Sequence, residues 1–414
     1  MKENSVNKTN KENVFVQIIT YALAFGMIIN CNSIFSTGLF ASRLNNSLLL
    51  LSFLEVFLIV ILQKIKTIDW GKYLVSILAL SAYLVIYILL QQKISTPLTS
   101  IKMLFTFLIF FSLAYLVYKT DNSPLLLDAY VNLITVISII SLFFWIFGSN
   151  LHLIRPNGMY LTKWAQPTFQ SVSSYYGLYF ETQTMGSMWR NSAIFAEAPM
   201  ASLNFSLALA ILILLLKKNR YYRWKILILT LGVVSTLSST GYIFLVLLIL
   251  GKILIGDDRN KYVFILKKII TPIILLLGVI LINYFFSQKM MSNSGVSRGQ
   301  DYINSFRAWE RYPLLGVGLN MANSLSPEDR LFIGKFGYSN SFGKILGETG
   351  IYVTILYIIS MIRSIYIGIK TQQSDRIFFT VILGYLFVTT IFVNTFLMFF
   401  IFSLIAVWTP KGAS

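Results

Sequence analysis

Two charged residues stand close together where a polar stretch gives way to an apolar run. The stretch is Met188 to Met200, MWRNSAIFAEAPM, and the two residues are Arg190 and Glu197. Pro199 fits the first turn of a helix, where its missing N–H is no loss, so a helix is predicted to start near Ala198. Glu197 then either complements the helix dipole or takes part in chemistry, and Arg190 is either a membrane-surface anchor or an anion ligand.

A second candidate segment runs from Arg298 to Arg311. Its apolar residues recur at helical spacing, and its polar residues share the opposite face; the first set is Tyr302, Ile303, Phe306 and Trp309, and the second is Gln300, Asn304, Arg307 and Arg311. This pattern predicts an amphipathic helix lying at the membrane surface. Guanidinium groups pair bidentately with phosphate, so the three arginines fit a diphosphate, with anionic lipid headgroups as the alternative.

The residues after this segment supply further candidates. Gly316 and Gly318 permit backbone conformations that let a ligand or another chain come close. Glu348 lies inside a later apolar span, one turn after Lys344. This pair either neutralises itself or leaves a carboxylate facing a polar cavity.

The composition places these residues in a membrane. Of the 414 residues, 56% are hydrophobic and only 12% are charged, which excludes an ordinary soluble domain. Apolar runs near the length of a membrane-spanning helix recur along the chain. They lie at 14–35, 46–63, 72–90, 101–118, 125–148, 198–216, 224–239, 240–256, 267–286, 341–362, 377–393 and 394–409.

These runs predict an all-α integral membrane protein with about twelve transmembrane helices in a single polytopic domain, 1–414. The stretches 224–256 and 377–409 fit either a helix pair or a re-entrant hairpin, and Thr236 to Gly241 is the preferred turn in the first. The two long polar interruptions, 149–197 and 287–340, are predicted loops on one side of the membrane. The second loop contains the amphipathic helix.

Basic residues indicate the orientation of the chain. Lysine and arginine gather in short segments at 64–72, 217–225, 252–268 and 363–376. By the positive-inside rule, both termini are then cytoplasmic and both long loops are extracytoplasmic. The net charge of +18 would fit nucleic acid only if the cations shared a solvated face, so no nucleic-acid partner is expected.

Metal and cofactor chemistry have little support in the sequence. Cys31 is the only cysteine and His152 the only histidine, so neither a disulfide framework nor a Cys/His metal cluster can form. A carboxylate-only metal site stays open, but we expect neither a metal nor a cofactor.

Three stretches occur in a familiar order and spacing. RNSAIFAEAP, Arg190 to Pro199, carries Arg, Phe, Glu and Pro before a helix, with Ala198 inserted where Glu-Pro is commoner. Arg298 to Gly318 carries Arg, Trp and Pro-Leu-Leu-Gly-Val-Gly. SNSFGKILGETG, Ser339 to Gly350, carries an Asn at a helix start and then Glu-x-Gly. Together they resemble the O-antigen polymerase and O-antigen ligase superfamily of bacterial surface-polysaccharide enzymes.

This resemblance implies glycosyl transfer at the outer face of the bacterial plasma (inner) membrane. The donor would be an undecaprenyl-diphosphate-linked glycan, and the acceptor would be a hydroxyl of another lipid-linked repeat unit. Arg190 and Arg298 would stabilise the diphosphate, and Glu197 is the first candidate for a general base. Substrate-binding candidates are Arg307, Arg311, Asn340 and Glu348.

Polymerase is the preferred reaction, because this chain has Ser339 where ligases of the superfamily have a histidine. An O-antigen ligase is one alternative. A flippase or transporter for lipid-linked oligosaccharides is another, although the chain shows no internal repeat of the kind that marks many transporters. Membrane lipid and other polysaccharide-assembly proteins are the remaining expected partners.

Overall fold

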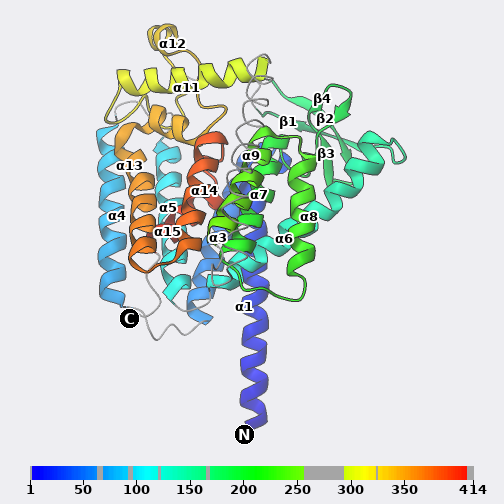
Figure 1. The fold of residues 1–414 in the computed structure, drawn as a ribbon. Helices are drawn as coiled ribbons and strands as arrows, with labels where there is room; N and C mark the ends of the chain where they lie inside the picture. Colours follow the sequence, from blue (N-terminus) through cyan, green and yellow to red (C-terminus); the bar gives the residue numbers. More distant parts are fainter. Residues whose placement is uncertain are drawn as a thin grey trace.

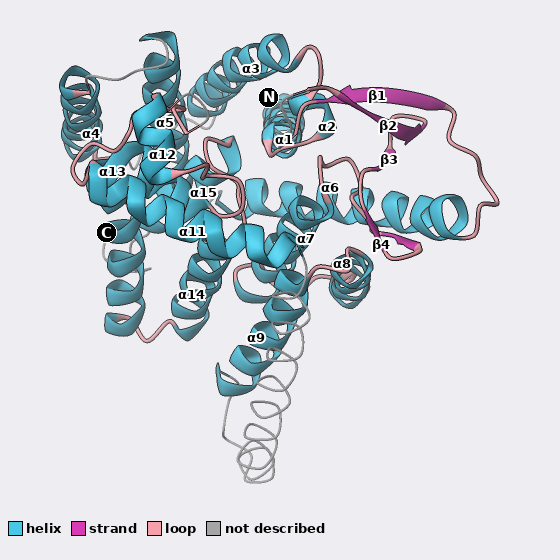
Figure 2. Ribbon diagram, turned by 90° about the horizontal axis from the view of Figure 1, so that it is seen from above, coloured by secondary structure: helices cyan, strands magenta, loops and turns pink. Residues whose placement is uncertain are grey.

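Helices form most of the protein in the computed structural model, which describes residues 2–62, 69–91, 97–119, 123–164, 168–255, 293–322 and 325–407. Most of them stand side by side in a bundle, while α11 lies across one end of it (Figures 1 and 2). The helices are α1 (Lys2–Asn30), α2 (Ile34–Thr37), α3 (Ala41–Leu62), α4 (Trp70–Leu90), α5 (Pro97–Lys119), α6 (Ser123–Phe144), the π-helical turn η1 (Trp145–Asn150), α7 (Ala198–Leu214), α8 (Tyr222–Ser235), α9 (Ser239–Ile255), α11 (Asn293–Arg311), α12 (Pro327–Ile333), α13 (Ser341–Lys370), α14 (Ser374–Thr389) and α15 (Phe396–Val407).

The described helices confirm a mostly helical, multi-pass membrane fold. Each predicted apolar span coincides with a helix, except 267–286, which lies outside the described residues. Within the described ranges, five helices are long and apolar enough to cross a membrane: Ala41–Leu62, Trp70–Leu90, Leu98–Leu116, Leu125–Asn150 and Ser341–Lys370. Several shorter apolar helices accompany them. The number of twelve spans stays a prediction.

The stretches 224–256 and 377–409, for which the sequence allowed a helix pair or a re-entrant hairpin, are both helix pairs. α8 and α9 are joined at Leu237, whose φ of 48° makes the turn inside the predicted segment. α14 and α15 are separated by a short break that is tied to the start of α13. There the Ser341 hydroxyl donates to the Thr390 carbonyl at 2.8 Å and accepts from the Phe392 N–H at 2.9 Å.

α7 occupies the middle of the bundle and is buried on nearly every side. Such a helix needs apolar residues all round, as its sequence APMASLNFSLALAILIL provides. Polar Asn204 is tolerated because its side chain donates to the Met200 carbonyl and accepts from the Tyr130 hydroxyl. Because α7 is fixed by this packing, the residue before it, Glu197, is held in a defined place.

α13 is broken in its first third by the loop that follows α11. Gly350 has a φ of 61° inside the helix, and the loop fills the gap in the helical hydrogen bonding. The N–H groups of Val317 and Gly318 donate to the carbonyls of Gly347 and Glu348 at 2.9 and 3.0 Å. The glycine-rich loop thus packs against α13 of the same chain, whereas the sequence predicted the close approach of a ligand or another chain.

Replacing Gly350 with alanine should destabilise the protein. The new Cβ would collide with the Leu314 carbonyl oxygen, and the positive φ is strained for any L side chain. Together these effects should cost about 1–3 kcal/mol or more. We expect a clear fall in the thermal midpoint of the detergent-solubilised protein. Gly299→Ala is the control, because its Cβ has open space on α11; an equal fall in both variants would contradict this account.

The first long loop contains strands that the all-α prediction did not include. β1 (Gly158–Thr162), β2 (Gln170–Tyr175) and β3 (Tyr179–Glu181) form an antiparallel sheet in that order. β4 (Thr184–Met185) and β5 (Met188–Trp189) form a hairpin around Gly186, whose φ is 62°. A two-residue loop beginning with glycine suits such a hairpin. The hairpin folds the chain back, so that Arg190 lies beside Gln183.

α11 confirms the predicted surface helix but not the expected use of its faces. Asp301, Asn304 and Ala308 are buried, whereas apolar Ile303 and Phe306 are about half exposed. The reason is that α11 rests on helix ends and turns, which present polar backbone groups. Asn304, for example, donates to the Lys335 carbonyl at 2.8 Å. The apolar stripe therefore faces away from the bundle.

Candidate functional site

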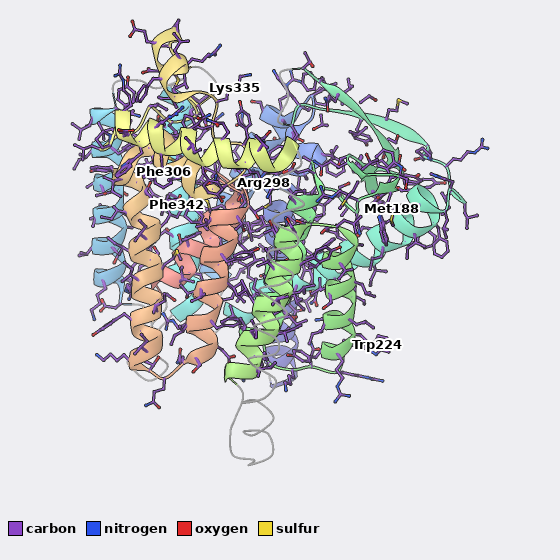
Figure 3. All side chains as sticks on the ribbon, turned by 45° about the horizontal axis from the view of Figure 1, so that its top comes forward. Met188, Trp224, Arg298, Phe306, Lys335 and Phe342 are labelled. Carbon is purple, nitrogen blue, oxygen red and sulfur yellow. The ribbon has the colours of Figure 1, made fainter. Side chains whose placement is uncertain are left out.

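Three of the predicted site residues come together from distant parts of the chain. Arg190 follows strand β5, Glu197 directly precedes α7, and Arg298 lies in the first half of α11. The charge of Arg298 acts on both Arg190 and Glu197, which places all three in one electrostatic neighbourhood. Figure 3 shows Arg298 near the end of α11 closest to the strands, with Phe306 farther along the helix. The site thus lies beneath that end of α11.

Gln183 connects Arg190 to Glu197. Its Oε1 accepts from Arg190 Nη1 at 3.2 Å and from the N–H of Ala198 at 3.3 Å, and its Nε2 donates to Glu197 Oε2 at 3.3 Å. The Arg190 N–H also donates to the Gln183 carbonyl at 3.0 Å. One amide therefore sets the arginine, the carboxylate and the start of α7 relative to one another.

Arg190 is anchored on its other side by the end of a helix. Its Nε donates to the Thr236 carbonyl at 3.0 Å, just after α8, where unpaired carbonyls carry partial negative charge. Burial lowers the pKa of Arg190, Glu197 opposes that shift, and Arg298 adds to it. With Nε and Nη1 held, the guanidinium keeps a fixed orientation toward the site.

The Glu197 carboxylate does not cap its own helix. Glu197 has extended backbone angles at the N-cap of α7, but its side chain makes no capping hydrogen bond. Burial raises its pKa, while Arg298, the Trp164 indole, Arg190 and Gln183 each lower it. Because burial has the larger effect, the pKa of Glu197 is higher than that of an exposed glutamate. A carboxylate with a raised pKa accepts a proton more readily, which suits proton transfer at ordinary pH.

Arg298 brings a second positive charge to the site. Its charge acts on Glu197 and on Arg190. Tyr302, one turn further on α11, and Tyr385 of α14 lie within its electrostatic reach. Two arginines and one carboxylate form an arrangement that can bind an anionic group and accept a proton beside it.

One known family matches part of the chain. Residues 193–358 are similar to the model of the family described as O-antigen ligase. No curated protein matches the chain. The matched region includes Glu197 and Arg298, whereas Arg190 and Gln183 come just before it, and it confirms the resemblance to the O-antigen polymerase and ligase superfamily.

Two further arginines of the matched region lie away from this site. Arg307 and Arg311 are about 14 and about 20 Å along α11 from Arg298 at the usual helical rise. Both are exposed, and Arg311 Nε lies 3.8 Å from Asp329 Oδ1. The structure does not bring these two together with Arg190, so their predicted substrate contacts would involve another part of a long substrate.

Asn340 is used to start α13. Its side-chain oxygen accepts from the Gly343 N–H at 2.5 Å as an N-cap, and it is fully buried. Its Nδ2 donates to Asp301 of α11 at 3.3 Å, and the Ser339 N–H donates to the same carboxylate at 2.9 Å. The Ser339 hydroxyl donates there as well. Asp301, which sequence reasoning missed, thus fastens α11 to the start of α13.

Glu348 stabilises the loop that breaks α13. It is only 2% exposed, and the backbone N–H groups of Asn320 and Ala322 donate to its carboxylate. Lys344, one turn earlier, is near enough to stabilise its charge. The Lys344 charge and the two backbone donors thus act together on the Glu348 carboxylate. A substrate contact of Glu348 stays a prediction.

No group of three or more His, Cys, Asp or Glu side chains in the described ranges could hold a metal ion.

Removing the Gln183 amide should slow the chemistry without unfolding the protein. Gln183→Ala frees Arg190 Nη1 and removes a donor that lowers the Glu197 pKa. We expect glycan transfer to slow about tenfold, the effect of about 1.4 kcal/mol. The acid limb of the pH–rate profile should also move to higher pH, because the Glu197 pKa rises further. Gln170→Ala is the control, because Gln170 is an exposed residue at the start of strand β2. An unshifted pH profile in Gln183→Ala would refute the role proposed for Gln183.

Proposed function

We propose that the protein is a polysaccharide polymerase. It transfers an undecaprenyl-diphosphate-linked glycan onto a hydroxyl of another lipid-linked repeat unit, at the outer face of the bacterial plasma membrane. The observation that carries the proposal is the convergence of Arg190, Glu197 and Arg298 within or beside the region that matches the O-antigen ligase family. Such a site suits a donor whose leaving group is a diphosphate at headgroup level.

In the proposed reaction, the acceptor hydroxyl attacks the anomeric carbon of the donor glycan. The bond between that carbon and the diphosphate oxygen breaks, and the hydroxyl proton passes to Glu197. The departing lipid diphosphate gains negative charge, which Arg190 and Arg298 stabilise through charge-assisted hydrogen bonds. The hydrogen bonds of the Gln183 amide hold the Arg190 and Glu197 side chains in position during this step.

The proposed topology follows from the same arrangement. α11 and the strands lie at one end of the bundle, and the N-terminus lies beyond the other end (Figure 1). The basic segments 217–225 and 363–376 flank helix ends away from α11. With these cations in the cytoplasm, both termini are cytoplasmic and the site is extracytoplasmic.

An O-antigen ligase reaction is the second candidate. It uses the same donor and leaving group, and the name of the matched family favours it. Against it stands Ser339, which occupies the place of the histidine in ligases and donates to Asp301. The two reactions therefore differ only in the acceptor that receives the glycan. The proposed donor site, with Arg190 and Arg298, would serve either reaction.

The test offers the purified protein two acceptors. Reconstituted protein is incubated with lipid-linked repeat units, either alone or with a lipid A–core acceptor. A ladder of longer lipid-linked glycans in both mixtures supports a polymerase, whereas product only on the added acceptor supports a ligase. Unchanged glycans that exchange between leaflets would indicate a flippase and refute both.

A further inference from the structure

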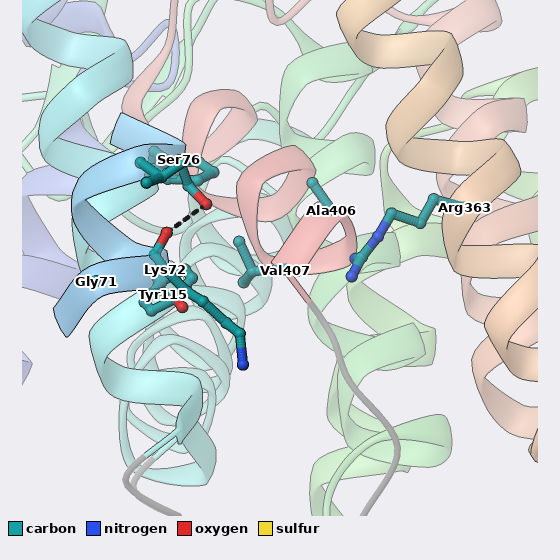
Figure 4. A pocket seen from close by; sticks show the side chains of 9 residues that line it. Gly71, Lys72, Ser76, Tyr115, Arg363, Ala406 and Val407 are labelled. Carbon is teal, nitrogen blue, oxygen red and sulfur yellow. Dashed lines mark hydrogen bonds between the residues drawn. The ribbon is translucent and has the colours of Figure 1, made fainter. Parts of the chain in front are cut away.

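The end of the bundle opposite α11 contains a cavity that glycan transfer does not use. It has a volume of about 540 Å³ and lies among α4, α5, α13 and α15 (Figure 4). Its wall combines two cations, Lys72 and Arg363, with the Tyr115 ring and the apolar Val75 and Val407. A cavity with a cationic rim and apolar walls suits an amphipathic anion.

Arg363 has a buried hydrogen-bond donor, Nη1, without an acceptor among the described residues. Leaving such a charged donor unpaired costs free energy, which an anionic oxygen in the cavity would recover. Figure 4 shows Arg363 reaching from α13 toward the cavity, with Lys72 on the other side. Lys72 Nζ is 2.9 Å from Asp69 Oδ2, so Lys72 contributes positive potential while Arg363 supplies the free donor.

The depth of Arg363 in the membrane matches that of a lipid headgroup. Arg363 stands 13 residues after the break at Gly350 and seven residues before Lys370, the last residue of α13, which is about 10 Å from that helix end at the usual helical rise. Because α13 begins at the α11 end of the bundle, Arg363 lies toward the opposite end, where the headgroups of the opposite leaflet would lie.

The surface beside the cavity is suited to acyl chains. On α4, the side chains of Leu74, Val75 and Leu78 are 51%, 68% and 65% exposed, so this helix presents an apolar face next to the cationic rim. A free phosphate ion would make no use of that face. We propose that the cavity binds the phosphate headgroup of an anionic phospholipid from the leaflet opposite α11, with Arg363 as the main ligand.

The test is a lipid titration of the full-length protein in detergent. Native mass spectrometry would follow binding of phosphatidylglycerol, with phosphatidylcholine and inorganic phosphate as comparison probes. Arg363→Gln should weaken phosphatidylglycerol binding about tenfold, the loss expected for a charge-assisted hydrogen bond. Arg223→Gln makes the same charge change at the same end of the bundle but on exposed α8, and it should leave binding within about twofold.

Each outcome decides the proposal. Selective loss of phosphatidylglycerol binding in Arg363→Gln supports it. Equal binding in the wild type and Arg363→Gln overturns it. Binding of inorganic phosphate as tight as that of phosphatidylglycerol would assign the cavity to a free anion and overturn the lipid source. None of these results depends on glycan transfer, so the proposal can fail or hold separately from the proposed function.

Discussion

Replacing Arg298 with alanine is expected to lower the rate of glycan transfer by about 10²- to 10³-fold, as for loss of one donor that stabilises transition-state charge. Because Arg298 lies on the surface helix α11, its removal should leave the fold intact. The measurement is initial transfer rate in reconstituted membranes, normalised to the amount of folded protein. Arg298→Lys should recover only part of the rate, because lysine keeps the charge but loses the bidentate fork.

Arg223→Ala serves as the matched control for this variant. It removes one arginine at the far end of the bundle, where Trp224 marks the lower end of α8 (Figure 3). We expect its rate to equal that of the wild type. If Arg298→Ala transferred glycan at the wild-type rate, or if Arg223→Ala fell equally far, the placement of the diphosphate at Arg298 would be wrong.

Replacing Glu197 with glutamine should remove the general base and slow transfer by about 10²- to 10⁴-fold. The amide keeps the size of the side chain, so α7 and its packing should be preserved. In the wild type, the rate should fall at acid pH as Glu197 takes up a proton. Because burial raises the Glu197 pKa, that fall should occur at higher pH than for an exposed glutamate.

The pH profile separates this role from a structural one. Glu197→Gln should lose the acid limb, so that its low residual rate no longer depends on pH in that range. A full rate in Glu197→Gln would exclude Glu197 as the base. A low rate with an unchanged acid limb would assign the titration to another group.

Periodicity and local signals predicted much of the fold. The helix start at Ala198 followed from Pro199, and α11 followed from its helical spacing. The grouping of Arg190 with Glu197 also followed, because the two are near in sequence and lie at the same polar-to-apolar boundary. These features depend on local chemistry, which a sequence displays directly.

The features that the sequence did not predict depend on tertiary contacts between segments that are far apart in the chain. Gln183 has no local signal, since its role arises only when the β4–β5 hairpin turns back on itself. Asp301 could have been noticed as an acid one turn after Arg298, but its partners come from residues 338–340, far along the chain. The outward apolar stripe of α11 could not be predicted either, because pattern alone does not say what a helix rests on.

The most direct test of the account measures the leaving group. Purified wild-type protein is given lipid-linked repeat units, and both the released lipid diphosphate and the new glycosidic bonds are counted over time. We expect one released undecaprenyl diphosphate for each bond formed, with both rates falling together in Arg298→Ala. Glycan that changes leaflets or acceptors without release of lipid diphosphate would refute the proposed transfer.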